Sequence, residues 1–251
     1  MRILLTGSKG QLGRALLAYA PTQLKGEKVE IFATSRENLD LADEHSCRTI
    51  VRNYMPHWVI NAGAYTSVDQ AESQPELAIA VNAKAPAAFS EALLHTGGKL
   101  LQLSTDHVFE GNQVTPYKTN QIRNPVNIYG KSKLIGELAI EDILNGTGQG
   151  TILRTSWMMG PVGHSFVKTM LEIHKNKKTC KVISDQVGGP TSSINLANTC
   201  WRIIALKSET NSIPNTLHYC DKGIVSWFDI AVAIGEIAIE IGLLKDIANV
   251  Q

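Results

Sequence analysis

The sequence predicts an α/β fold: a Rossmann-like, doubly wound parallel sheet with helices on both faces, followed by a smaller C-terminal lobe. Short apolar runs alternate with helical patterns as far as Thr155, a glycine-rich turn joins the first run to the first helix, and the alternation becomes irregular after Trp157. Alternating strands and helices are typical of parallel sheets, because parallel neighbours need a crossover connection that is usually a helix.

In the first part of the chain, strands are predicted at short apolar, β-rich runs, and helices where apolar residues recur at three and four positions. The predicted strands are Arg2–Thr6, Val29–Ala33, Trp58–Asn61, Lys99–Ser104 and Thr151–Thr155; the predicted helices are Gln11–Tyr19, Cys47–Tyr54, Glu76–His95 and Asn127–Ile143. The polar, proline-bearing segment Pro116–Val126 is predicted to be a loop.

The second part is less regular. Its predicted helices are Phe166–Asn176, Ile194–Leu206 and Ser226–Gly242, with short strands near Lys181–Ser184 and Thr216–Tyr219. We place the boundary between residues 157 and 158, which gives a main domain of residues 1–157 and a lobe of residues 158–251.

The composition argues against several classes of protein. The 251 residues carry 24 Lys+Arg against 23 Asp+Glu, a net charge of +1, which gives no electrostatic footprint for nucleic acid or an anionic membrane. No apolar run approaches the ~20 residues that span a bilayer, and the N-terminus is too glycine-rich for a signal peptide. The four cysteines form no CxxC pair and the histidines no HExxH motif, so we expect neither a disulfide framework nor a metal site. We expect a cytoplasmic protein.

The first strand runs into a glycine-rich turn. Gly7, Gly10 and Gly13 are three residues apart, and Gln11 and Leu12 lie where the first helix begins. Glycine permits a sharp turn and a close approach of backbone N–H groups to a pyrophosphate, and the helix N-terminus adds partial positive charge. This turn, between strand and helix, predicts a dinucleotide-binding domain.

The end of the second strand is where such a domain reads the adenosine ribose. An acidic residue there favours NAD, because it accepts a hydrogen bond from the 2′-hydroxyl. This strand ends in Thr34, Ser35 and Arg36, and Glu37 comes only afterwards. Hydroxyls and a guanidinium suit a 2′-phosphate, so we expect NADPH, with NADH as the alternative cofactor.

A candidate catalytic set follows. Tyr129 and Lys133 lie four residues apart at the start of a predicted helix, with Asn127 as its N-cap. A nearby ammonium lowers the pKa of a phenol from its usual value near 10, and Lys133 can also donate to the ribose hydroxyls of a nicotinamide nucleotide. Thr105 lies where the fourth strand ends, at the carboxyl edge where doubly wound sheets bind ligands. Together the pattern predicts Thr105, Tyr129 and Lys133 as catalytic residues.

These pieces, in this order, resemble the extended short-chain dehydrogenase/reductase superfamily. Longer segments around them carry a closer resemblance: residues 61–72 (NAGAYTSVDQAE), 104–109 (STDHVF), 127–134 (NIYGKSKL), 153–157 (LRTSW) and 182–191 (VISDQVGGPT). These segments resemble one family within the superfamily, the dTDP-4-dehydrorhamnose reductases. The resemblance covers nearly the whole chain.

The resemblance implies an oxidoreductase that reduces the C4 keto group of dTDP-4-dehydro-L-rhamnose with NADPH, in dTDP-rhamnose biosynthesis for cell-surface polysaccharide such as O-antigen. It implies cofactor contacts for Asp40, Leu41, Ala62, Gly63, Ala64 and Tyr65, besides Tyr129 and Lys133, and substrate contacts for Thr66, Val68, Thr105, Asp106, Phe109, Trp157 and Gln186. On spacing alone, Phe109 and Trp157 fit core aromatics equally well.

Three departures from the family pattern bear on activity, and one of them is His164-Ser165, where the family often has asparagines in the substrate lobe. His107 stands where the family commonly has a tyrosine, and the chain stops at Gln251, where family members usually continue. We therefore expect a lobe that is incomplete at its C-terminus.

Two alternatives stay open. One is another sugar-nucleotide epimerase, reductase or dehydratase on the same scaffold, although a dehydratase should carry glutamate after its Thr-Asp pair, where this chain has His107. The other is an NADP-binding regulatory subunit resembling the beta subunit of methionine adenosyltransferase. A homodimer is compatible with the sequence, which holds no signal for the oligomeric state.

Overall fold

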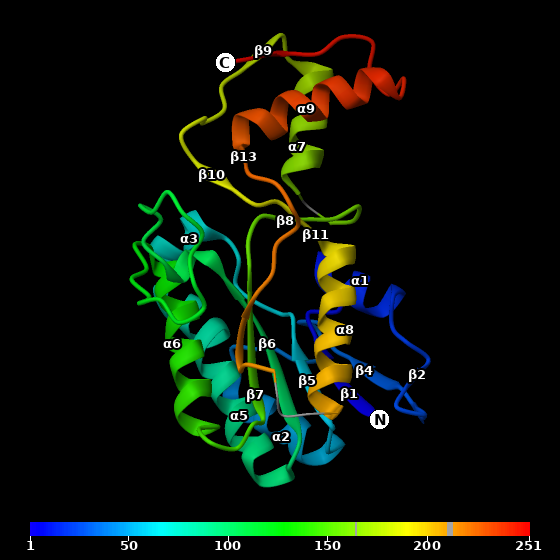
Figure 1. Cartoon of the computed structure of the whole chain (residues 1–251), viewed down its shortest axis with the longest axis vertical. Coiled ribbons are helices and arrows are strands. Elements are labelled where there is room, and N and C mark those ends of the chain that lie inside the picture. The colour runs from blue at the N-terminus through cyan, green and yellow to red at the C-terminus, as the bar shows by residue number, and fades with distance from the viewer. Residues whose placement is uncertain (164, 210–212) are drawn as a thin grey trace.

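The chain forms a six-stranded sheet with helices on both faces and a lobe at one end (Figure 1). The computed structural model describes residues 1–163, 165–209 and 213–251. Along the sheet the strands are ordered β12, β7, β6, β5, β1 and β4, and neighbours pair in parallel. Their bounds are β1 Arg2–Thr6, β4 Glu30–Ala33, β5 Trp58–Asn61, β6 Lys99–Thr105, β7 Gly150–Thr155 and β12 Thr216–His218. The predicted fold class is confirmed, and each of these strands was predicted to within one residue.

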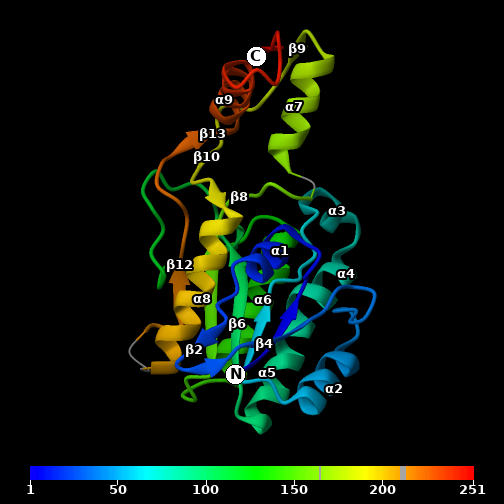
Figure 2. The ribbon, with the colours of Figure 1, turned by 90° about the vertical axis from the view of Figure 1, so that its right-hand side faces the viewer.

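Two apolar cores flank the sheet, one on each face. Helices α1 and α8 cover one face, and α2, α5 and α6 cover the other (Figure 2). The bounds are α1 Gln11–Ala18, α2 Glu44–Tyr54, α5 Ala85–Thr96, α6 Ile128–Ile143 and α8 Ser193–Glu209. In β1, Ile3 and Leu5 belong to one core and Leu4 to the other, as the alternation of side chains along a strand requires. Burial on both faces explains why the strands read as continuous apolar runs.

One helical stretch, Pro75–Thr96, is long and apolar enough to cross a bilayer by length and composition alone. It comprises α4 (Pro75–Ile79), a π-helical turn (Ala80–Lys84) and α5. More than half of its tested window, 56%, is buried inside the fold. Core helices pass the same test, so the stretch is weak evidence for a membrane span.

Polar caps fix where two helices begin. Asn127 Oδ1 accepts a hydrogen bond from the backbone N–H of Gly130 at the start of α6, which confirms the predicted N-cap. Helix α9 (Trp227–Glu240) begins with a capping box, in which Ser226 and Asp229 each accept a hydrogen bond from the other's backbone N–H.

The lobe is built on two helices, α7 (Phe166–Asn176) and α9, which pack against each other. Buried His174 joins them, because its Nε2 lies 2.9 Å from the carbonyl oxygen of Ala231. Three short strand pairs complete this end of the molecule: β8 (Met158–Met159) with β11 (Thr191–Ser192), β9 (Thr179–Cys180) with β14 (Asn249–Val250), and β10 (Val187–Gly188) with β13 (Val225–Ser226).

The strand predicted at Lys181–Ser184 is wrong. The backbone there makes single hydrogen bonds to different segments, from Val182 N–H to the carbonyl of Gln251 and from Phe228 N–H to the carbonyl of Ile183. These contacts do not repeat along one neighbour, so no ladder forms. The short strand pairs at the lobe end were not predicted, and neither were β2 (Gln23–Leu24), β3 (Glu27–Lys28) and α3 (Val68–Ser73).

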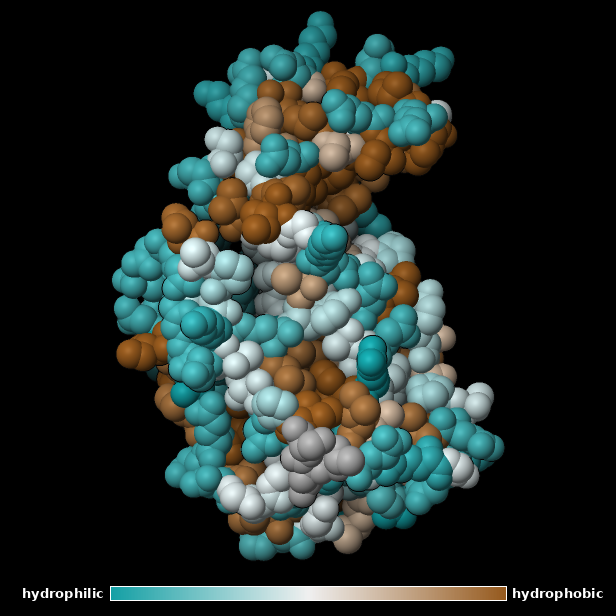
Figure 3. Space-filling model, viewed as in Figure 1, coloured by the Kyte–Doolittle hydropathy of each residue, from teal (hydrophilic) through white to brown (hydrophobic). Residues whose placement is uncertain are grey.

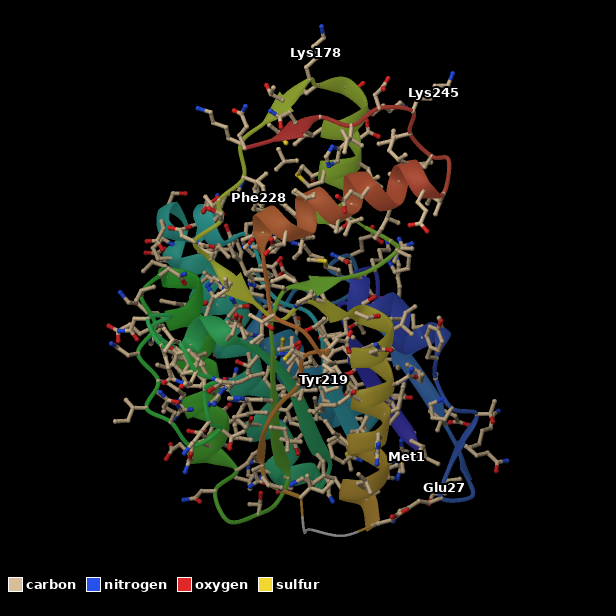
Figure 4. All side chains as sticks on the ribbon, turned by 45° about the horizontal axis from the view of Figure 1, so that its top comes forward. Met1, Glu27, Lys178, Tyr219, Phe228 and Lys245 are labelled. Atoms are coloured by element: carbon tan, nitrogen blue, oxygen red, sulfur yellow. The ribbon has the colours of Figure 1, made fainter. Side chains whose placement is uncertain are left out.

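The chain crosses between the sheet and the lobe more than once. It leaves the sheet after β7, returns as α8 and β12, and leaves again toward α9. In Figure 4, Tyr219 lies beside the sheet, whereas Phe228 lies at the start of α9 in the lobe. The division at residues 157 and 158 stays a prediction, and the topology refines it: α8 and β12 follow that boundary in sequence but lie with the sheet, because their apolar side chains pack on its core.

Candidate active site

The glycine-rich turn between β1 and α1 is built by close backbone contacts. Gly7 has a positive φ of 66°, and a Cβ on it would stand 2.6 Å from the backbone nitrogen of Gly63. A Cβ on Gly13 would stand 2.1 Å from the carbonyl oxygen of Gly7. Gly10 is the N-cap of α1 and has no side chain that could accept hydrogen bonds. The first N–H groups of that helix therefore face the turn without a side-chain acceptor. The turn therefore has the shape and partial charge that a pyrophosphate requires.

A cavity of about 190 Å³ lies beside this turn. It brings together eight residues predicted to contact the cofactor: Gly7, Ser35, Arg36, Asp40, Leu41, Gly63, Ala64 and Tyr65. Three apolar lining residues were not predicted: Leu39, Leu77 and Val81. Arg36 is exposed, and the neighbouring Glu37 carboxylate pairs with Lys9 at 2.5 Å, so it does not neutralise Arg36. The cradle and its lining fit a dinucleotide with a 2′-phosphate.

Two predicted cofactor residues contribute backbone rather than side chain to this region. The side chain of Leu12 is 4% exposed and belongs to the apolar core, and Ala62 packs against the same core. Gln11 begins α1 directly after the turn.

A row of buried polar side chains runs under the ends of β1, β5 and β6. Thr6 Oγ1 accepts a hydrogen bond from the N–H of Gly63 and donates to Asn61 Oδ1 at 2.6 Å. Asn61 Nδ2 donates to Gln102 Oε1 at 2.7 Å, and Gln102 Nε2 donates to the carbonyl of Leu103 at 2.8 Å. Sequence reasoning missed this row, whose signal is a polar residue at the end of β1 and of β5 and a glutamine inside the otherwise apolar run of β6.

The predicted catalytic residues meet beside the carboxyl end of this row. Lys133 Nζ donates to the same Leu103 carbonyl at 2.6 Å. Thr105 ends β6, and Tyr129 lies in the first turn of α6, close enough for the Thr105 side chain to lower the pKa of the Tyr129 phenol. Thr105 Oγ1 also lies 3.0 Å from Asp106 Oδ1. The structure thus brings all three predicted residues to one edge of the sheet.

The electrostatics of Tyr129 differ from the prediction. Burial raises the pKa of its phenol to about 12, and the hydrogen bond with Thr105 only partly offsets that rise. Burial lowers the pKa of Lys133 to about 8, and the charge of Glu137 acts in the opposite direction. Sequence spacing predicts a lowered phenol pKa, but here burial dominates and the ammonium is engaged by a backbone carbonyl.

An ion network that sequence reasoning missed lies one helical turn beyond Lys133. Glu137 is 1% exposed and accepts hydrogen bonds from Arg154 at 2.9 and 2.6 Å and from Ser104 Oγ at 2.5 Å. Arg123 contacts it from the loop before α6 at 3.0 Å. Burial raises the pKa of Glu137, but hydrogen bonds and charge from Arg154 outweigh this, and the pKa lies below its usual value. The network fixes α6 against the ends of β6 and β7.

A second cavity, of about 350 Å³, opens beside Asp106. Of the predicted substrate residues, Asp106 and Phe109 line it, together with Arg154, the loop 113–117, Thr155, Ser156, Val187, Gly189, residues 218–220, Gly223 and Ile224. Phe109 is 4% exposed because Tyr117 stacks on it at 4.4 Å. Its ring is therefore largely a core aromatic, one of the two interpretations that spacing left open.

The remaining predicted substrate residues lie outside the lining of this cavity. Thr66 and Gln186 are exposed, and Val68 begins α3. Trp157 adopts a positive φ of 41° and stacks on Trp227 of α9, with ring centroids 3.9 Å apart. It therefore joins the sheet to the lobe. Figure 3 shows hydrophobic side chains gathered on the lobe above a more polar surface.

Within the described ranges, no group of three or more His, Cys, Asp or Glu side chains could hold a metal ion.

A doubly wound sheet, a glycine turn with close backbone contacts and a Thr-Tyr-Lys cluster at the sheet edge define an NAD(P)-dependent oxidoreductase of the short-chain dehydrogenase/reductase type. The comparisons give the family. The chain belongs to the RmlD substrate binding domain family, which matches residues 1–245.

Two kinds of relative support this assignment. The chain is 37% identical, over 252 aligned residues, to a dTDP-4-dehydrorhamnose reductase of Aggregatibacter actinomycetemcomitans, covering 100% of this chain and 83% of that protein. It is similar to the crystal structure of such a reductase from Clostridium acetobutylicum ATCC 824, with TM-score 0.88, 36% identity and coverage of 100% and 83%. The enzyme from Bacillus anthracis str. Ames, in complex with NADP, matches with TM-score 0.87, 33% identity and coverage of 99% and 82%.

Proposed function

We propose that this chain is an NADPH-dependent reductase that converts the C4 keto group of dTDP-4-dehydro-L-rhamnose to the alcohol of dTDP-L-rhamnose. The observation that carries the proposal is the meeting of Thr105, Tyr129 and Lys133 beside Asp106, which lines the larger cavity. The substrate in this proposal is the one in the names of the relatives, which are dTDP-4-dehydrorhamnose reductases. The chain then acts in the cytoplasm, on a cytoplasmic sugar nucleotide.

The cofactor would be held by the turn and the smaller cavity. Gly7, Gly10 and Gly13, with Gln11 and Leu12, offer backbone N–H groups and the N-terminus of α1 to the pyrophosphate. Ser35 and Arg36 take the 2′-phosphate, Asp40 and Leu41 lie at the adenine, and residues 62–65 line the path toward the sheet edge. When bound, NADPH supplies the hydride.

The protein's own chemistry is proton transfer and orientation. Tyr129 donates its phenolic proton to the oxygen of the reduced carbonyl, and the Thr105 hydroxyl donates a hydrogen bond to the same oxygen. A phenol with a pKa of about 12 is protonated at neutral pH, which is the state a proton donor requires. Lys133, held by the Leu103 carbonyl, directs positive charge toward this edge and stabilises the phenolate that is left.

The sugar nucleotide would lie between the sheet edge and the lobe. Asp106 and Phe109 reach it from the larger cavity, and Trp157 from its stack with Trp227. Thr66, Val68 and Gln186 complete the proposed set from the surface around this edge.

The test is the oxidation of NADPH, followed by absorbance, with dTDP-4-dehydro-L-rhamnose as substrate. The proposal expects dTDP-L-rhamnose in equal amount to NADP⁺. The unepimerised dTDP-4-dehydro-6-deoxy-D-glucose serves as the competing substrate, since one relative is named as a dTDP-4-keto-6-deoxy-D-glucose reductase. Faster turnover of that sugar than of dTDP-4-dehydro-L-rhamnose would show that the proposed substrate is wrong. Tight NADPH binding without turnover of either sugar would favour the regulatory-subunit alternative.

A further inference from the structure

His107 makes an edge-on contact with Tyr129 that the proposed mechanism does not use. The two ring centroids lie 5.4 Å apart and the ring planes meet at 75°. His107 belongs to the 3₁₀ turn Asp106–Val108, directly after Thr105, and its backbone N–H donates to Thr105 Oγ1 at 3.2 Å. One residue therefore contacts both Tyr129, the proposed proton donor, and Thr105, the proposed hydrogen-bond donor.

The protonation of His107 can be read from its neighbour Asn127. Asn127 caps α6, and its Oδ1 accepts from Gly130 N–H at 2.7 Å. The Nδ2 of the amide is then the atom that lies 3.1 Å from His107 Nδ1. Because an amide NH₂ group only donates, Nδ1 must carry a lone pair, and the proton of the neutral ring lies on Nε2.

Glycine at position 130 brings the same two segments into backbone contact. A Cβ on Gly130 would stand 2.1 Å from the carbonyl oxygen of His107, so any other residue would displace the start of α6. The turn and the helix therefore meet at the His107 carbonyl, at the ring nitrogen Nδ1 and at the ring edge. We call these contacts the His107 clamp.

We propose that His107 is a positioning residue: its neutral ring, held as the Nε2–H tautomer by Asn127, fixes the Tyr129 ring against Thr105. The inference rests on the proposed role of Tyr129 as proton donor.

A protonated ring would not fit the clamp. It would present an N–H to the Asn127 NH₂ group, and two donors do not bond. Titratable groups on the elements around the clamp include Asp106 on the same turn, Tyr129 on α6, and Glu72 of α3, whose carboxylate accepts from Ile128 N–H at 2.8 Å.

The first experiment reads the tautomer without cofactor or substrate. Long-range ¹H–¹⁵N spectra of the full chain separate the two neutral tautomers and the imidazolium, and the His107→Phe variant identifies the signals of His107 among the seven histidines. We expect a single Nε2–H form at neutral pH. An Nδ1–H form, or a mixture of the two tautomers, would overturn the inference.

The Asn127→Asp variant reverses the hydrogen bond while keeping the helix cap, since aspartate caps helices as well as asparagine does. One carboxylate oxygen still accepts from Gly130 N–H, and the other now accepts from the ring. We expect the proton to move to Nδ1 or the ring to become doubly protonated. An unchanged spectrum would show that Asn127 does not set the tautomer.

The second experiment separates positioning from simple stability. In His107→Ala, kcat should fall roughly 10- to 100-fold, the scale of a displaced catalytic group, while the Kd for NADPH stays within about twofold. His107→Phe keeps the ring contact with Tyr129 and should recover part of kcat.

Exposed His95, at the end of α5, gives the matched control: His95→Ala should change neither kcat nor the Kd for NADPH. Wild-type kcat in His107→Ala would overturn the positioning role. If the wild-type chain turned over no sugar nucleotide, the proposed function would fail, and the tautomer spectra would still decide whether the clamp exists.

Discussion

The sheet edge and the lobe hold their side chains in different ways. At the sheet edge, polar groups are buried and paired: Asn61 and Gln102 are 1% and 2% exposed, and Glu137 lies within its ion network. In the lobe, apolar side chains face outward, with Ile237 and Ile241 on α9 and just after it 53% and 68% exposed. The sheet edge thus fixes its groups by directional hydrogen bonds, whereas packing of α7 on α9 and ring stacking position the lobe.

This difference matches two proposed roles: the sheet edge positions the groups for proton transfer, and the lobe helps to enclose the substrate. Preorganised donors must be held to within a fraction of an ångström to assist proton transfer, and a fully paired buried network does this. Binding of a sugar nucleotide requires two sides that enclose it, and the stack of Trp157 on Trp227 links the two sides. Substitutions at the sheet edge should therefore change kcat or stability, and those in the lobe should change KM.

Tyr129→Phe gives the largest expected effect. It removes the proposed proton donor and keeps the ring, so turnover should fall roughly 10²–10⁴-fold. The Kd for NADPH, measured by fluorescence titration, should stay nearly constant. Turnover within a few-fold of wild type would exclude Tyr129 as the acid.

Glu137→Gln breaks the buried network at the sheet edge. It leaves Arg154, which is 3% exposed, without its carboxylate, and loss of a buried ion-pair partner costs about 3–5 kcal/mol of unfolding free energy. Urea denaturation measures the loss. Glu141→Gln is the matched control on the same helix: its half-exposed pair with Arg123 is expected to contribute at most about 1 kcal/mol. Equal losses in the two variants would contradict the difference between buried and exposed pairs.

The pH dependence of stability should report Lys133. The pKa of a lysine ammonium is ordinarily 10.5, and burial lowers that of Lys133 to about 8, so the unfolded chain binds more protons between these two values. The contribution of Lys133 to the unfolding free energy should therefore rise with pH between these two values, by about 3 kcal/mol at most.

Two buried thiols change the unfolding free energy with pH in the opposite direction. The effect of Lys133 must therefore be measured as a difference between the wild type and a Lys133 variant. Burial raises the pKa of Cys47 and Cys200 from 9.0 to about 12, so their contribution falls as pH rises above 9. Subtracting the curve of Lys133→Met from that of the wild type cancels the thiols. A difference that is flat with pH would show that the Lys133 ammonium is not destabilised by burial.

Trp227→Leu tests the lobe side of the comparison. It removes the stack on Trp157 without touching the sheet edge, so KM for the sugar nucleotide should rise about tenfold, the equivalent of about 1.4 kcal/mol. The Kd for NADPH should not change. Ile237→Ala, an exposed change on the same helix, controls for general loosening of the lobe. A loss confined to kcat would place Trp227 with the sheet edge instead.

Arg36→Ala gives the smallest expected effect. Only NADPH offers a 2′-phosphate to the guanidinium, so NADPH affinity should fall about fivefold to tenfold and NADH affinity should hold. Isothermal titration with both cofactors measures this, and exposed Arg52 of α2 supplies the control Arg52→Ala. An equal loss for both cofactors would mean that Arg36 does not read the phosphate.

The fold was predictable because its signals are local. Doubly buried strands such as Trp58–Asn61 read as apolar runs, and the Asn127 cap marks the start of α6. The return of α8 and β12 to the sheet was not predictable, since the pairing of β12 with β7 joins segments more than sixty residues apart, as Thr216 opposite Ile152. No short window contains that information.

The site shows the same limit. Spacing placed Thr105, Tyr129 and Lys133 together, but the direction of the Tyr129 pKa depends on burial, which only tertiary packing determines. Glu137, four residues after Lys133, carried a weak signal: a carboxylate on the same helical face as the proposed catalytic lysine needs a buried partner. The partner, Arg154, comes from β7, the strand that follows α6, and no spacing rule links it to Glu137, so the sequence pattern could not supply it.

The repeated crossing of the chain between sheet and lobe has a mechanical consequence. The lobe is attached by three covalent connections, after β7, before α8 and after β12, which limit the orientations it can take relative to the sheet. A body held by a single linker loses much rotational freedom when a ligand closes it, whereas a body held by several has little left to lose. Enclosing a ligand should therefore cost little configurational entropy in this protein, and more of the contact energy remains to hold the ligand.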